Sequence, residues 1–170
     1  MLIREEHAAD DWAINDLTIR AFKPMSYSDG SEAPIIRALR RTGHLTLSLV
    51  AEEEGKIIGH VAFSPIAING IDDGWFGLGP IAVEPARQRS GIGRALIRDG
   101  LQRLKERGAL GVALIGDPAF YSRLGFQSDG LLTYKDVDRV YVQRIVFSGP
   151  VPEGEIRYAE AFEGENSSKA

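Results

Sequence analysis

The chain contains no cysteine, which excludes disulfide bonds, thiolate metal sites and a cysteine nucleophile. It also has no apolar run near the roughly 18 residues that a membrane-spanning helix needs, and its early acidic residues are unlike a signal peptide. The formal net charge is −4, whereas broad nucleic-acid binding depends on an excess of basic residues. These absences predict a cytoplasmic protein whose partners are neither membranes nor nucleic acids.

Two kinds of catalytic site are also missing. No Gly-x-Ser-x-Gly elbow is present, and the three histidines lie far apart with no metal-ligand spacing. We therefore expect neither a serine hydrolase nor a metal site. The 170 residues are 44% hydrophobic and 26% charged, which is typical of a soluble globular protein. We predict a single domain over 1–162 and a disordered polar tail over 163–170.

The first third of the chain predicts a strand, two helices and a hairpin. The strand covers 2–5, and the first helix begins at Asp10 as its N-cap and ends before Pro24. The second helix begins at Ser31 and ends near Gly43. Alternating leucines from residue 45 to 49, a Glu-Gly turn at 54–55 and a return strand over 57–68 then predict a hairpin.

His60 lies in that return strand and shares one face of it with Ala62 and Ser64. Two polar groups on one face of a central strand need hydrogen-bond partners or a ligand. His60 is thus either a core histidine with satisfied hydrogen bonds or a ligand contact, and both interpretations stay open. Pro65, further along, predicts an interruption of strand pairing.

The next strand, 77–83, contains Pro80, which has no N–H to donate in the middle of a sheet. A bulge, or a separation from the neighbouring strand, is the natural consequence. After this strand, Gln88-Arg89-Ser90-Gly91-Ile92-Gly93 leads into a helix that ends at Gly108. The glycines let the backbone approach a ligand, and unpaired N–H groups at a helix N-terminus attract anions, most naturally phosphate.

A second block follows the long helix. An apolar run over 110–115 predicts a buried strand, and Asp117 with Pro118 predicts the capped start of a short helix. The segment Tyr121-Ser122-Arg123-Leu124-Gly125-Phe126 comes next. The strands 141–147 and 155–158 are predicted to form a last hairpin.

These two blocks, in this order, resemble the GNAT N-acetyltransferases. The segment 88–93 is similar to their acyl-CoA pyrophosphate loop, and 121–126 is similar to the segment that ends their core. The resemblance implies the α/β (α+β) GNAT acyl-CoA N-acyltransferase fold, with a mixed and mostly antiparallel sheet of six to seven strands, about four flanking helices and splayed central strands. The pantetheine arm of the cofactor lies in that opening in the family.

The resemblance further implies transfer of an acetyl group from acetyl-CoA, as co-substrate, to a primary amine of a small molecule or peptide. The protein would be a monomer or a homodimer. An alternative is an acyl-CoA-binding sensor without transferase activity. The cofactor-binding residues that the resemblance implies are Ile81, Ala82, Val83, Gln88, Arg89, Ser90, Gly91, Ile92, Gly93, Arg94, Asp117, Phe120, Tyr121 and Arg123.

The resemblance also suggests catalytic roles. Tyr121 stands where the family places the acid that protonates the departing thiolate, or else its ring only packs beneath the cofactor helix. Glu84 and His60 are the candidate bases for the amine, although a water relay also serves in the family. One residue departs from the family pattern, because Leu114 stands where many members have asparagine.

Overall fold

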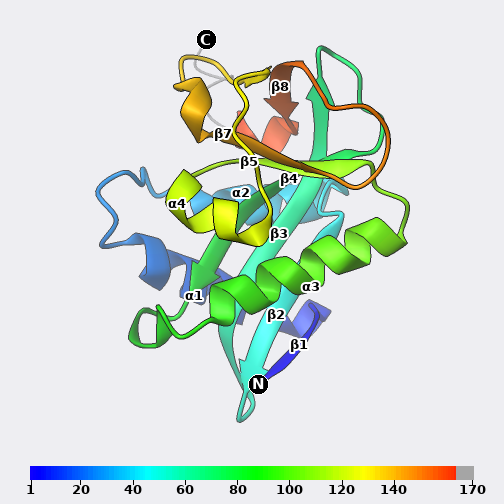
Figure 1. Ribbon diagram of the computed structural model, residues 1–170. Helices are drawn as coiled ribbons and strands as arrows, with labels where there is room; N and C mark the ends of the chain where they lie inside the picture. Colours follow the sequence, from blue (N-terminus) through cyan, green and yellow to red (C-terminus); the bar gives the residue numbers. More distant parts are fainter. Residues whose placement is uncertain (164–170) are drawn as a thin grey trace.

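The computed structural model describes residues 1–163, and its four α-helices flank a sheet of eight strands (Figure 1). The predicted tail over 163–170 lies, apart from Glu163, outside these residues. The strands are β1 (Leu2–Glu5), β2 (Leu47–Glu53), β3 (Lys56–Ile68), β4 (Trp75–Val83), β5 (Gly111–Ile115), β6 (Leu132–Thr133), β7 (Val142–Val146) and β8 (Gly154–Tyr158). The helices are α1 (Asp11–Phe22), α2 (Glu32–Thr42), α3 (Ile92–Glu106) and α4 (Pro118–Tyr121).

The main path through the sheet is β1-β2-β3-β4-β5-β7, with β8 paired to β3 and β6 paired to β8. Among the strand pairs of residues 1–163, only β4–β5 and β6–β8 are parallel, so the predicted mixed and mostly antiparallel sheet is confirmed. The strand count exceeds the predicted six to seven because the two-residue strand β6 has no sequence signal of its own.

A bulge sets the register of the β2–β3 hairpin. Glu54 and Gly55 both have positive φ, 51° and 77°, which gives the tight turn its right-handed twist. Beyond the turn Glu52 pairs with Ile57 but Ala51 pairs with Gly59, so Ile58 is one extra residue. As a result Ser48, opposite Ala62, lies on the same face of the sheet as His60.

The predicted interruption at Pro65 is confirmed. The pairing of β3 with β2 ends at Phe63, and from Ile66 onward β8 takes the place of β2 beside β3. Pro65, which has no N–H, lies where β3 changes partners.

Pro80 has the predicted consequence on both sides of β4. On one side, the register with β3 shifts between Val61 and Phe63, so two residues of β4 stand opposite Ala62. On the other side, β4 pairs with β5 only over Trp75–Gly77. The rest of β4, 78–83, is unpaired toward β5, and the sheet is open in its middle.

Helices cover both faces of this sheet, as Figure 1 shows, with α3 crossing one face and α1 and α2 behind the other. Leu96 of α3 and Phe63 of β3 belong to the main core, whereas Leu17 of α1 packs on Ala82 of β4. The buried apolar face of each helix therefore fixes where β4 lies between the two layers.

Gly100 allows the close approach of α3 to the sheet, because a Cβ atom at this position would collide with the ring of Phe63. We expect Gly100→Ala to lower the free energy of unfolding by about 1–3 kcal/mol, although alanine favours helices. Guanidinium chloride titration measures this. Gly93→Ala in the same helix is the control, since its Cβ would lie 3.8 Å from Val83, and no loss is expected there. Equal stability of the two variants would contradict the packing argument.

One local prediction was wrong and one held only in part. The strands β7 and β8 do not form a hairpin, because β7 pairs with β5 and β8 pairs with β3. Alternation indicates a strand but not its neighbour. Asp10 is the N-cap residue of α1, as predicted, but its carboxylate makes no capping hydrogen bond and instead accepts from Arg4 and from the backbone N–H of His7.

Candidate active site

A row of free backbone N–H groups precedes α3. Within residues 1–163, none of the six amides from Arg89 to Arg94 donates a hydrogen bond, and the first helical bond runs from Ala95 to the Gly91 carbonyl. Arg89 and Gly91 have positive φ, 65° and 91°, which turns successive amides in one direction. Such a concave row at the positive end of a helix dipole is suited to a diphosphate.

The side chains of the loop support its shape. The Gln88 side-chain amide donates to the Val83 carbonyl at 3.3 Å, and the Ser90 hydroxyl donates to the Arg87 carbonyl. Arg87 itself is paired with Glu53 at 2.8 Å. Arg89 and Arg94 are exposed, so their charges face solvent beside the free amides.

The open part of β4 leads to this loop. Ile81 and Val83 are half-buried and pack with the α3 layer, whereas Ala82 is buried against α1. Because Leu78 to Val83 are unpaired toward β5, their backbone groups on that side are available to an extended ligand.

Tyr121, at the end of α4, lies near this opening. Its ring packs edge-on against Phe120 and Phe126, with centroids 4.9 and 5.8 Å apart. Burial raises the pKa of Tyr121 to about 12, with smaller contributions from Tyr27 and Asp117. The hydroxyl is therefore protonated at neutral pH. It makes no hydrogen bond within the described chain and is not among the fully buried unpaired atoms.

The remaining predicted cofactor residues lie on α3, on α4 and on the short segments next to α4. Asp117 caps α4 by accepting from the Ala119 N–H at 3.0 Å, as predicted. The Arg94 guanidinium lies 6.0 Å from the centre of the Phe120 ring, which links α3 to α4. Arg123 is exposed on the segment that follows.

Glu84, a predicted base, is held by a residue of α1. Both of its carboxylate oxygens accept from Arg20, at 2.7 and 3.3 Å. Arg20 was not anticipated from the sequence, because 64 positions separate the two residues and neither belongs to a motif. The pair joins α1 to the end of β4.

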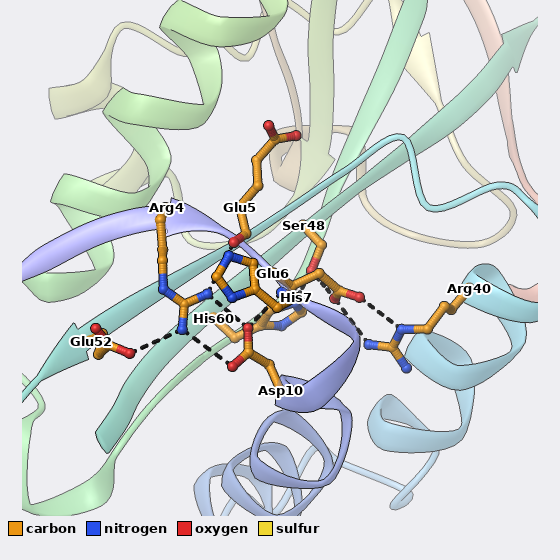
Figure 2. A network of polar contacts seen from close by, with 9 residues as sticks. All are labelled: Arg4, Glu5, Glu6, His7, Asp10, Arg40, Ser48, Glu52 and His60. Atoms are coloured by element: carbon orange, nitrogen blue, oxygen red, sulfur yellow. Dashed lines mark hydrogen bonds and ion pairs between the residues drawn. The ribbon is translucent and has the colours of Figure 1, made fainter. Parts of the chain in front are cut away.

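His60, the other predicted base, is fully buried and belongs to a polar network (Figure 2). Its Nε2 lies 2.7 Å from the Ser48 hydroxyl, which also donates to Glu6. Glu6 in turn accepts twice from Arg40, at 2.9 and 3.0 Å. Burial lowers the pKa of His60 to about 4, with Glu6 opposing the shift and Arg40 adding to it. His60 is therefore neutral at neutral pH.

The low pKa of His60 predicts a pH-dependent stability. Between pH 6.5 and 4 the unfolded chain binds a proton that the folded protein excludes, so stability falls as the pH falls. We expect His60 to lower the free energy of unfolding by about 2 kcal/mol between pH 7 and pH 5. Denaturant titrations of the wild type and of His60→Gln measure this difference.

The exposed His7 provides the control for that measurement. His7→Gln should keep the loss between pH 7 and pH 5, whereas His60→Gln should remove most of it. The same slope in all three proteins would show that His60 is not buried in its neutral form.

Comparison with known proteins identifies the family of this chain. Residues 45–128 match the family model of the acetyltransferase (GNAT) domain. The uncharacterised N-acetyltransferase YhbS of Escherichia coli K12 is 44% identical over 128 residues, which cover 75% of this chain and 74% of YhbS. The chain belongs to the GNAT acetyltransferase family. The resemblance inferred from the two sequence blocks, and the fold class that it implied, are thereby confirmed.

Two solved structures share this fold throughout. A GNAT family acetyltransferase from Brucella melitensis, in complex with acetyl-CoA, is 45% identical with a TM-score of 0.86, covering 95% of this chain and 97% of that one. The YhbS structure from E. coli, in complex with CoA, is 34% identical with a TM-score of 0.86, covering 95% and 91%. In this GNAT chain, no helix within residues 1–163 is long and apolar enough to cross a membrane.

Proposed function

We propose that the protein transfers the acetyl group of acetyl-CoA to a primary amine by direct attack in a ternary complex. The observation that carries the proposal is the opening between β4 and β5, which ends at six free amides before α3. An extended chain with a diphosphate at one end matches this arrangement. The two similar proteins solved with acetyl-CoA and CoA support the choice of ligand.

Each part of the site has a role in the proposal. The amides from Arg89 to Arg94 bind the diphosphate, with the arginine side chains nearby. The backbone from Ile81 to Val83 pairs with the pantetheine amides as an added strand would. A backbone N–H near Val83 polarises the thioester carbonyl.

Proton transfer divides between two residues. A lysine-like amine has a pKa near 10.4 and must lose a proton before it attacks, and the departing thiolate must gain one. Tyr121 protonates the departing thiolate, because its raised pKa keeps the hydroxyl protonated at neutral pH. We assign removal of the amine proton to Glu84, directly or through water, since a histidine with a pKa of about 4 holds a proton poorly.

The test is transfer itself. The protein is incubated with acetyl-CoA and a panel of small amines, amino acids, aminoglycosides and peptides with free N-termini. Thiol release is followed by a chromogenic disulfide, and the acetylated product by mass spectrometry. We expect release that depends on both the amine and the protein. Acetyl-CoA binding without release across the panel would instead favour the sensor, and absence of binding would refute both.

A further inference from the structure

The hydrogen bonds around Ser48 fix the position of the proton on His60. The Arg40 guanidinium and the Ser48 hydroxyl outweigh the effect of burial and hold the pKa of Glu6 below its usual range. Glu6 is therefore an ionised carboxylate, which only accepts hydrogen bonds. Ser48 must give its single proton to Glu6, so its oxygen accepts from His60. His60 thus carries its proton on Nε2.

The other nitrogen of His60 is left as a buried acceptor. Nδ1 has no hydrogen-bond partner within the described residues, and the whole side chain is inaccessible. The Ser64 hydroxyl, on the same face of β3, is likewise buried and unpartnered. A buried polar atom without a partner costs about 1–3 kcal/mol, which favours a partner that arrives with the ligand.

The register of the sheet places this acceptor beside the proposed reaction centre. His60 stands opposite Ala82 of β4, and cross-strand neighbours have Cβ atoms about 5 Å apart on the same face. Glu6 and Ser48 lie on the side away from β4, where they line a surface hollow with Arg40. Figure 2 shows Ser48 between the Glu6 carboxylate and His60, and Arg40 on the far side of Glu6.

We propose that Glu6 and Ser48 are positioning residues: they hold the proton of the neutral, buried His60 on Nε2, so that Nδ1 accepts a hydrogen bond, through one water molecule, from the N–H of the acceptor amine. This role rests on the proposed transferase function. It requires no proton transfer to His60. A neutral imidazole with its proton on Nε2 has no proton on Nδ1 to donate. Nδ1 of His60 therefore stays a hydrogen-bond acceptor across the working pH range.

The arrangement is tested by nitrogen NMR and by kinetics. In ¹⁵N-labelled wild type at pH 7, long-range proton–nitrogen spectra should show the His60 proton on Nε2, with His60→Gln assigning the signals. Ser48→Ala should give mixed tautomers. It should also raise KM for the amine about tenfold and leave KM for acetyl-CoA unchanged, as expected for one lost hydrogen-bond arrangement.

Two further variants test whether the hydroxyl of Ser48 is responsible for these effects. Ser48→Thr keeps a hydroxyl and should restore both the tautomer and the amine KM. Thr42→Ala removes a hydroxyl 3.2 Å from Nδ1 of His44, away from β4. It should change neither the His60 tautomer nor the KM for the amine. A proton on Nδ1 in the wild type, or an unchanged amine KM in Ser48→Ala, would overturn the proposal. If no amine is acetylated, the transferase function fails, and the NMR result alone still decides the arrangement around His60.

Discussion

Tyr121→Phe is expected to lower kcat about 100-fold and to change the Kd for acetyl-CoA little. The substitution removes the hydroxyl but keeps the ring, which packs against Phe120 and Phe126. Without the acid, the thiolate departs unprotonated. Because burial raises the Tyr121 pKa to about 12, wild-type kcat should show no loss from tyrosine ionisation up to about pH 10. Steady-state kinetics and calorimetry measure the two effects separately.

Tyr134→Phe is the matched control, since it also removes a phenol hydroxyl but its ring packs on Tyr158 and not on Phe120 or Phe126. Its kcat should equal that of the wild type. A Tyr121→Phe enzyme within twofold of the wild type on a good substrate would show that the ring only packs beneath α3. A weakened Kd at normal kcat would point to cofactor binding instead of acid catalysis.

Gly91→Trp is expected to weaken acetyl-CoA binding at least 100-fold. Within residues 1–163, nothing lies within 4 Å of the position that a Cβ would take at Gly91, so the indole would occupy the space over the free amides. The left-handed backbone there, with φ of 91°, adds a strain of about 1–2 kcal/mol. Isothermal calorimetry with acetyl-CoA reports the loss.

Gly108→Trp is the control that separates blocking of the proposed diphosphate site from backbone strain. Gly108 follows the other end of α3 and has a φ of 88°, and a Cβ there would also have no described residue within 4 Å. Both variants should therefore lose similar stability, and only Gly91→Trp should lose the cofactor. Equal affinities in the two variants would remove the diphosphate from this loop.

The features read correctly from the sequence are those in which one residue type has one physical meaning. Pro80 cannot donate a hydrogen bond, so an opening or bulge beside it could be predicted, and both are present. Pro65 marked a change of partner for the same reason. Asp117 before Pro118 predicted a capped helix, and the carboxylate does cap it.

The features missed depend on distant partners or on register. Arg20 reaches Glu84 only because α1 packs on β4, and no local pattern records this contact. The side-chain contact of Ser48 with His60 depends on the strand register, which the sequence does not show. Counting back from the Glu54-Gly55 turn without a bulge places the two side chains on opposite faces, and the extra residue Ile58 reverses this.

The bulge at Ile58 has a consequence for how this chain tolerates insertions and deletions. Removing one residue between Lys56 and Gly59 would leave the turn intact and change no charged or polar group. It would remove the bulge and keep the pairs from Ala51–Gly59 onward, so His60 would stay opposite Val50 on its present face of the sheet. Loss of one residue in this short segment therefore leaves the strand pairing around His60 unchanged, whereas loss of Asn69 would remove its side-chain hydrogen bonds with the backbone of Glu153 and Glu155.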